Sequence, residues 1–245
     1  MDIAGKVALV TGGAIRVGRE TAMELARARA DLLIHYRTSA TEAEQVAEAI
    51  RAMGRRAVTV QADFAQPADA CGALLRAIDE SFAGRCDILV NNASAYMPGS
   101  PSSLAADQWA YLLTVNLTAP TMLAERIGQR MVDAGGGAII NMLDLQARRP
   151  WPRHLGRGMA AGAMWTATIG LARKFAPAVR VNGVAPGTVL WNPADGEELR
   201  QRIIEQTPLR RLGTPGDVAK AVRFLVESDY ITGQVLCVDG GRSMG

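Results

Sequence analysis

Short apolar runs of strand length alternate with longer stretches that favour helices along this 245-residue chain. Such alternation is typical of a parallel sheet whose strands are joined by crossover helices, because those strands are buried on both faces. We therefore predict an α/β fold, with one doubly wound domain over residues 1–245 and a seven-stranded parallel sheet. The predicted strands are residues 7–11, 31–36, 57–61, 88–91, 138–142, 179–184 and 235–238. Stretches rich in Ala, Leu, Glu and Arg predict helices at residues 42–53, 68–82, 105–132 and 157–175.

The composition is consistent with one large hydrophobic core, and it indicates the cellular compartment of the protein. Hydrophobic residues make up 49% of the chain, which excludes a disordered protein. No apolar run approaches the roughly 18 residues that span a bilayer, and the start of the chain lacks the features of a signal peptide. The three cysteines lie among apolar residues, as buried thiols do, so we predict neither disulfides nor a metal site. We expect a cytoplasmic protein without a membrane partner.

Charge and histidine content exclude three further classes of protein. The net charge is +3, but the basic residues are dispersed and only 5% of the chain is aromatic. A nucleic-acid surface needs clustered positive charge, so we expect no nucleic-acid partner. His35 and His154 belong to no Gly-x-Ser-x-Gly or His-Glu-x-x-His motif, which argues against a serine hydrolase or a zinc enzyme.

A glycine-rich segment, residues 11–18, follows the first predicted strand and opens a helix. Glycines there allow a tight turn, and free N–H groups at a helix start attract phosphate. Gly13 and Gly18 also have the spacing of a Walker A loop, but Arg19 and Glu20 stand where that motif needs Lys and Ser or Thr. The segment predicts dinucleotide binding beyond the strands' carboxyl ends, with a plain strand-to-helix turn as the alternative.

Further motifs follow in order, and together they resemble the short-chain dehydrogenase/reductase family over essentially the whole chain. They are Thr11-Gly12, Asn91-Asn92-Ala93, Asn116, Pro186-Gly187 and Val238-Asp239-Gly240-Gly241. The resemblance implies a Rossmann-type domain. It also implies that a dinucleotide contacts Gly12, Arg16, Val17, Gly18, Asn91, Asn92, Ala93, Pro186 and Gly187.

The segment after the second predicted strand indicates which dinucleotide binds. It consists of His35, Tyr36, Arg37, Thr38 and Ser39. It has no acid to accept hydrogen bonds from the ribose 2′-hydroxyl of NAD. A cation with two hydroxyls would instead neutralise and hydrogen-bond a 2′-phosphate, so we predict NADP(H). The family resemblance adds Asp63 and Phe64 beside the adenine, and the alternative for Arg37 is a solvated surface charge.

Several residues resemble those at the matching positions of the pteridine reductase branch of that family. Arg16 stands where most members carry Gly, and Asp144 stands where most carry Ser. Tyr96 matches an aromatic residue that helps to sandwich a pterin ring, a contact worth about 0.5 to 1.5 kcal/mol beyond burial. Trp191 lies in the family's substrate loop, and ordinary packing is the alternative for both aromatic residues. The implied substrate-binding residues are Arg16, Ser94, Tyr96, Arg157 and Trp191.

The catalytic tyrosine and lysine of the family are both replaced. The alignment puts Arg157 at the tyrosine position and Ala161 at the lysine position. Arginine stays protonated at any ordinary pH, so Arg157 can stabilise negative charge but is a poor general acid. We therefore predict that reduction of ordinary ketones is absent or very slow.

Asp144 and Asn116 are the candidate catalytic residues that remain. Asp144 could relay a proton through water or pair with the amino group and ring nitrogen of a pterin. The alternative is a structural ion pair with Arg148, Arg149 or Arg157. Asn116 matches the family residue that holds a water at a helix distortion. His154 titrates in the useful range, but a lone loop histidine is weak support for catalysis.

Two functions are consistent with these residues. The first is an NADPH-dependent reductase of a pteridine or a similar small heterocyclic or carbonyl substrate, in which Asp144 and water replace the tyrosine. The second is a non-catalytic homologue that binds a dinucleotide or metabolite, or serves as a partner subunit. Small residues in the helix at 157–175 also predict a homo-oligomer, a tetramer by resemblance, with packing on its own sheet as the alternative. They are Gly158, Ala160, Ala161, Gly162, Ala163, Ala167 and Gly170.

Overall fold

The computed structural model describes residues 1–97, 104–191 and 195–244. Within them, seven parallel strands form one sheet in the order β3-β2-β1-β4-β5-β6-β7. The strands are β1 Val7–Val10, β2 Asp31–Tyr36, β3 Ala57–Gln61, β4 Ile88–Asn91, β5 Gly137–Met142, β6 Val179–Pro186 and β7 Val235–Val238. The predicted α/β fold and parallel sheet are confirmed. Because the chain runs outward from β1 in both directions, the switch point lies between β1 and β4, where such sheets bind ligands.

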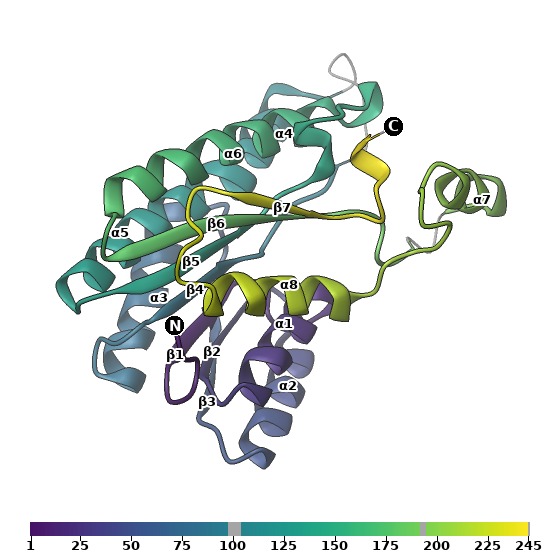
Figure 1. Ribbon diagram of the computed structural model, residues 1–245. Helices are drawn as coiled ribbons and strands as arrows, with labels where there is room; N and C mark the ends of the chain where they lie inside the picture. Colours follow the sequence, from purple (N-terminus) through teal and green to yellow (C-terminus); the bar gives the residue numbers. More distant parts are fainter. Residues whose placement is uncertain (98–103, 192–194, 245) are drawn as a thin grey trace.

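Successive residues of the central strands face two separate hydrophobic cores. In β1, Ala8 and Val10 contribute to one core, whereas Val7 and Leu9 contribute to the other. Both faces are covered, which explains why these strands read as continuous apolar runs. Helices α1 and α8 lie on one side of the sheet in Figure 1, and α5 and α6 lie on the other. The first core packs under α1 Arg16–Arg27, α2 Ala40–Ala52 and α8 Pro215–Glu227, and the second under α3 Pro67–Phe82, α5 Ala119–Asp133 and α6 Leu155–Phe175.

The stretch predicted as one helix at residues 105–132 is divided into three parts. A π-helical segment, η1 Thr114–Thr118, separates α4 Ala106–Leu113 from α5. The prediction of a continuous helix is wrong here, because a π segment inserts an extra residue into a turn without changing the local composition. The distortion contains Asn116, at the position where the family resemblance predicted one.

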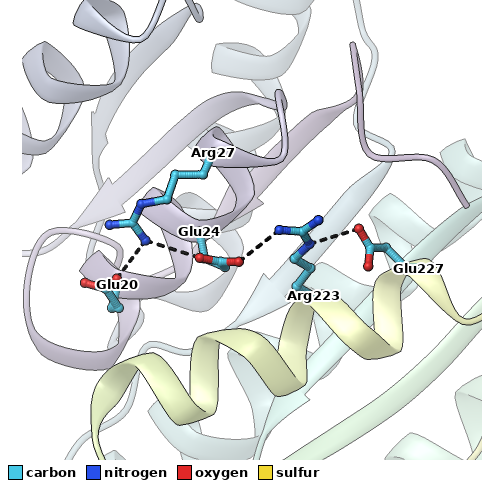
Figure 2. A network of polar contacts seen from close by, with 5 residues as sticks. All are labelled: Glu20, Glu24, Arg27, Arg223 and Glu227. Carbon is cyan, nitrogen blue, oxygen red and sulfur yellow. Dashed lines mark hydrogen bonds and ion pairs between the residues drawn. The ribbon is translucent and has the colours of Figure 1, made fainter.

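Ion pairs on the surface connect the two helices that cover the first core. Figure 2 shows Glu24 of α1 between Arg27 of the same helix and Arg223 of α8. The nitrogen–oxygen distance of both pairs is 3.2 Å, and Glu20 and Glu227 extend the network with pairs of 2.9 Å. Exposed pairs of this kind contribute at most about 1 kcal/mol each, so the buried apolar residues supply most of the α1–α8 contact.

The remaining helices lie around the carboxyl ends of the strands. The helix α7 Glu197–Glu205 was not predicted, and in Figure 1 it stands apart from the sheet beyond β6. Three short 3₁₀ segments complete the chain, namely η2 Leu145–Ala147, η3 Pro152–His154 and η4 Arg242–Met244. Among the residues described, no helix is both long enough and apolar enough to cross a membrane. The cysteines are free thiols; Cys71 and Cys86 are buried, and Cys237 is half-buried.

Candidate functional site

A cleft of about 890 Å³ opens at the carboxyl ends of the strands, next to the switch point. The loops that follow β1 to β6 line it. We call its two parts the Gly12 end, formed by the loops after β1, β2 and β3, and the Asp144 end, formed by those after β5 and β6. The predicted residues that line the cleft are Gly12, Arg16, Val17, Gly18, His35, Tyr36, Arg37, Thr38, Ser39, Asp63, Phe64, Asn91, Asn92, Ala93, Ser94, Tyr96, Asn116, Asp144, Arg157, Pro186 and Gly187.

Close backbone packing shapes the glycine loop. A Cβ atom on Gly18 would lie 2.0 Å from the carbonyl oxygen of Gly12 and 2.5 Å from the side-chain nitrogen of Asn92. Gly12 itself has a φ of +61°, and Arg16, where most relatives carry Gly, has a φ of +54°. Both values lie in the left-handed region that favours glycine. The loop therefore brings its backbone close to the cleft, as a phosphate cradle at a helix start requires.

Thr11 and Asn92 hold the glycine loop against the loop after β4. The Thr11 hydroxyl oxygen accepts the N–H groups of Asn92 and Ala93, at 2.8 and 3.0 Å. The Asn92 side chain donates in return to the carbonyl oxygens of Thr11 and Gly12, at 2.9 and 3.1 Å. These reciprocal hydrogen bonds fix the loops after β1 and β4 to each other at the switch point.

His35 supports the Gly12 end from inside the protein. Its Nδ1 accepts the Gly12 N–H at 3.0 Å, so the ring proton is on Nε2, which lies 3.1 Å from the carbonyl oxygen of Ala62. The ring also stacks on Phe64, with centroids 4.7 Å apart. Burial lowers the pKa of His35 to about 4, although the hydrogen bond to Ala62 opposes that shift. Both ring nitrogens are thus bonded to backbone groups, and the predicted cofactor contact of His35, which lines the cleft, stays a prediction.

Arg37 and the two hydroxyl residues after it form the donor set at the far side of the Gly12 end. Arg37 is exposed, and its guanidinium donates a 2.6 Å hydrogen bond to the hydroxyl of Tyr111 on α4. Thr38 and Ser39 follow directly and line the same cleft. A cation with free N–H groups beside two hydroxyls suits a dianionic phosphate, so these residues fit the 2′-phosphate of NADP(H).

Asn91 and Asn116 are both used for internal hydrogen bonds. The Asn91 side chain donates to Pro120 and to the side-chain oxygen of Asn141, which in turn donates to Thr168. The Asn116 amide bonds both the N–H and the carbonyl oxygen of Ala95, at 2.7 and 2.9 Å. Asn116 therefore positions the loop that carries Tyr96, which is a structural role not foreseen in the sequence.

Asp144 makes an ion pair with Arg157 at the other end of the cleft. The distance from Arg157 Nε to Asp144 Oδ2 is 2.5 Å, and the second carboxylate oxygen accepts the N–H of Gln146 at 2.9 Å. The Asp144 side chain is 17% exposed and that of Arg157 is 35% exposed. The alternative of an ion pair with Arg157 is thus realised, and the pair faces the cleft.

An aromatic group covers that ion pair. The Arg157 guanidinium lies 5.4 Å from the centre of the Tyr96 ring, and the Tyr96 hydroxyl is 3.5 Å from Nδ1 of His154. Burial raises the pKa of the Tyr96 phenol, although the Arg157 charge opposes the shift. Tyr96 is therefore a poor proton donor at neutral pH. Ala161 lines the cleft, whereas Lys174 forms an ion pair with Glu125 on α5.

Of the predicted substrate-side residues, one lies outside the cleft lining, and the cleft also includes residues that the sequence did not indicate. Trp191 does not line the cleft; the Arg200 guanidinium of α7 lies 5.5 Å from the centre of its ring. Residues from distant segments take part instead, and no local motif marked them. They are Tyr111, Arg149, Trp151, Thr188 and Arg242.

Comparisons with known proteins agree with this architecture. A family model described as enoyl-(acyl carrier protein) reductase matches residues 13–243. An uncharacterized oxidoreductase of Mycobacterium tuberculosis is 38% identical over 246 residues, covering 96% of this chain and 91% of that protein. The FolM alternative dihydrofolate reductase 1 of Brucella canis, solved in complex with NADP, is 31% identical with a TM-score of 0.92, covering 100% of this chain and 96% of that one. The angucycline C-6 ketoreductase LanV with bound NADP is 32% identical, also with a TM-score of 0.92, and the match covers 100% of this chain and 98% of that one.

Proposed function

The chain belongs to the short-chain dehydrogenase/reductase family, and on that premise we propose that it is an NADPH-dependent reductase of a pteridine or a similar flat heterocyclic or carbonyl substrate. One observation carries the proposal: the Asp144–Arg157 pair faces the cleft, with the Tyr96 ring against the Arg157 guanidinium. A carboxylate at that place can accept hydrogen bonds from the amino group and ring N–H of a pterin. An aromatic ring beside it can stack on a flat substrate.

The Gly12 end supports NADP(H) as the cofactor. Arg37 supplies positive charge, Thr38 and Ser39 supply hydroxyl donors, and the segment of residues 35–39 contains no acid to bind the ribose 2′-hydroxyl of NAD. Because Gly12 and Gly18 lack side chains, the glycine loop packs closely against the loop after β4, and the start of α1, where N–H groups attract phosphate, lies at the cleft. Two of the similar solved structures contain NADP. When bound, the nicotinamide supplies the hydride for reduction.

The Asp144 end supplies orientation and a proton path without a tyrosine. Arg157 is permanently charged and stabilises negative charge, while Asp144 orients the substrate and relays a proton from water. A pterin ring nitrogen is basic enough to be protonated before reduction, whereas a ketone needs a proton on its oxygen as it is reduced. Flat basic heterocycles are therefore the favoured substrates, and simple ketones the disfavoured ones.

A second function is favoured by the same ion pair. Because Arg157 already occupies one oxygen of Asp144, and Ala161 replaces the lysine, the site also suits a non-catalytic homologue that binds a dinucleotide or metabolite. Such a protein could serve as the partner subunit of an active relative. It would bind NADPH with the same preference but would turn over none of the substrates.

Consumption of NADPH, followed by absorbance, distinguishes the two functions. The purified protein is mixed with NADPH and a panel of dihydropterins, quinones and ketones. We expect turnover of a dihydropterin or another flat heterocycle and little or none of a ketone. NADPH binding without turnover of any of them would favour the non-catalytic function, and fast ketone reduction would contradict the roles given to Arg157 and Asp144.

We also propose that the protein is a cytoplasmic homo-oligomer, a tetramer by analogy with its family. On α6, Gly158, Ala160 and Ala161 are buried, which accounts for the packing of that face. The opposite face exposes Met159 at 53% and Ile169 at 41%, together with Gly162 and Gly170, around which there is open space. An exposed apolar stripe with small residues lets two helices approach closely. A monomeric mass in light scattering would refute this.

A further inference from the structure

Two arginines converge at the edge of the Asp144 end, and neither belongs to the family motifs described above. The Arg242 side chain comes from the C-terminal segment η4, and Arg149 comes from the loop between η2 and η3. The Arg149 guanidinium donates to the backbone carbonyl oxygen of Arg242 at 3.0 Å. Both residues line the cleft. Two arginine residues from distant segments therefore lie together at one wall of the cleft.

Arg242 is buried to an extent that is unusual for an arginine. Only 6% of the residue is exposed. Its guanidinium donates to the Thr188 hydroxyl at 2.6 Å and lies 4.6 Å from the centre of the Trp151 ring. Burial, and then the charge of Arg149, lower its pKa. The side chain is thus fixed by packing at a place where its charge is poorly solvated.

The carboxylates near Arg242 are used elsewhere. Asp144 pairs with Arg157, and the two Asp239 oxygens accept the N–H groups of Gly241 and Ser243. Within the described residues, neither Arg149 nor Arg242 makes an ion pair with a carboxylate. A buried guanidinium with one side-chain hydrogen bond keeps several N–H donors available, and a buried charge without a counter-ion is costly. The fold therefore keeps a buried positive charge, with its unfavourable free energy, beside the substrate cleft.

We propose that Arg242 and Arg149 form a carboxylate-binding subsite, so that the substrate is a flat ring that carries a carboxylate. The inference rests on the proposed function only in taking the Asp144 end as the substrate site. Asp144 already pairs with Arg157, so among the described residues Arg149 and Arg242 are the cleft arginines here without a carboxylate ion pair. A substrate carboxylate would supply that partner, because the planar forks of arginine match its two oxygens.

The test measures binding by calorimetry to the protein saturated with NADP⁺, so that no turnover is needed. Two pairs of probes differ only in the charged group. The first is pterin-6-carboxylate with 6-hydroxymethylpterin, and the second is naphthalene-2-carboxylate with naphthalene-2-methanol. In each pair of probes that binds, we expect the carboxylate to bind at least about tenfold more tightly than the neutral alcohol.

Variants then assign any preference to the two arginines. Arg242→Gln and Arg149→Gln should each remove most of the preference for the carboxylate and leave the neutral probe unaffected. Arg148→Gln is the matched control, because Arg148 lies in the same loop but contacts Trp165 and does not line the cleft. Unchanged NADP⁺ affinity verifies that each variant is folded, and the exposed Arg149 tests the subsite even if Arg242→Gln is unstable.

Three results would overturn the subsite. They are equal binding within both probe pairs, a carboxylate preference that survives both glutamine variants, and tighter binding of 2-naphthyl phosphate than of naphthalene-2-carboxylate. A preference in the naphthalene pair with no binding of either pterin would retain the subsite. It would instead contradict the pteridine part of the proposed function, so the two failures are distinguishable.

Discussion

At the Gly12 end of the cleft, groups are held by close backbone packing and buried hydrogen bonds, whereas at the Asp144 end they are held by partly exposed charges. Thr11, Asn92 and His35 each bond backbone groups of neighbouring loops. Asp144 and Arg157 instead bond each other. The first arrangement tolerates little change, because a methyl group added at Gly18 would overlap the carbonyl oxygen of Gly12. The second arrangement leaves more room for substitution, because its side chains are partly exposed.

The largest expected effect is that of Gly18→Ala at the Gly12 end. The new Cβ would overlap the Gly12 carbonyl oxygen, so we expect a loss of about 3 kcal/mol in unfolding free energy and no measurable NADPH binding. Denaturant unfolding and calorimetry measure the two quantities. Gly72→Ala is the control, because a Cβ on that glycine of α3 would meet only the end of the Arg76 side chain, at 3.4 Å, and the change should be neutral or stabilising. Tolerance of Gly18→Ala would contradict the steric account.

The next effect is the pH dependence contributed by His35. Its pKa is lowered from 6.5 to about 4, so the folded state favours the neutral ring. The stabilisation is complete above pH 6.5 and is lost as the pH falls towards 4, with a total of about 3 kcal/mol. The unfolding free energy of the unmodified protein should therefore fall more steeply over this window than that of His35→Gln. Parallel curves for the two proteins would show that His35 does not titrate as the structure indicates.

A smaller effect is expected for Arg37→Ala at the outer edge of the Gly12 end. Loss of one charged contact to the 2′-phosphate should weaken NADPH binding by about tenfold and leave NADH binding unchanged. Tyr111→Phe is the control, since it removes the hydrogen-bond partner of Arg37 but not its charge. If Arg37→Ala keeps the full preference for NADPH, Arg37 is a surface charge only.

The difference between the two ends also explains what the sequence could predict. The strands were located within two residues because all are rich in apolar side chains, although those of the edge strands β3 and β7 are mostly half-buried. The glycine loop was recognised because steric need restricts its residues to a few types. Composition did not indicate the π-helical turn at Thr114–Thr118, because the extra residue changes the hydrogen bonding and not the composition. The family resemblance alone predicted a helix distortion at Asn116.

The Asp144 end was only partly predictable. Asp144 was identified by its place after a strand, with Arg157 among several possible partners. The contact of Arg149 with Arg242 joins residues 93 positions apart, and no local pattern indicates it. Trp191 was expected at the substrate and lies against Arg200 of α7, a helix that the sequence did not predict. Groups held by single tertiary contacts leave little trace in the sequence around them.

The most direct test of the central claim is the rate of dihydropterin-dependent NADPH oxidation by the unmodified protein and by Asp144→Asn. We expect the unmodified protein to turn over the dihydropterin and the variant to lose at least about 100-fold of that rate, with unchanged NADPH affinity. Asp79→Asn, which breaks an exposed ion pair with Arg130, should retain full activity. A variant Asp144→Asn that is as active as the unmodified protein would contradict the claim that this carboxylate does the work of the missing tyrosine.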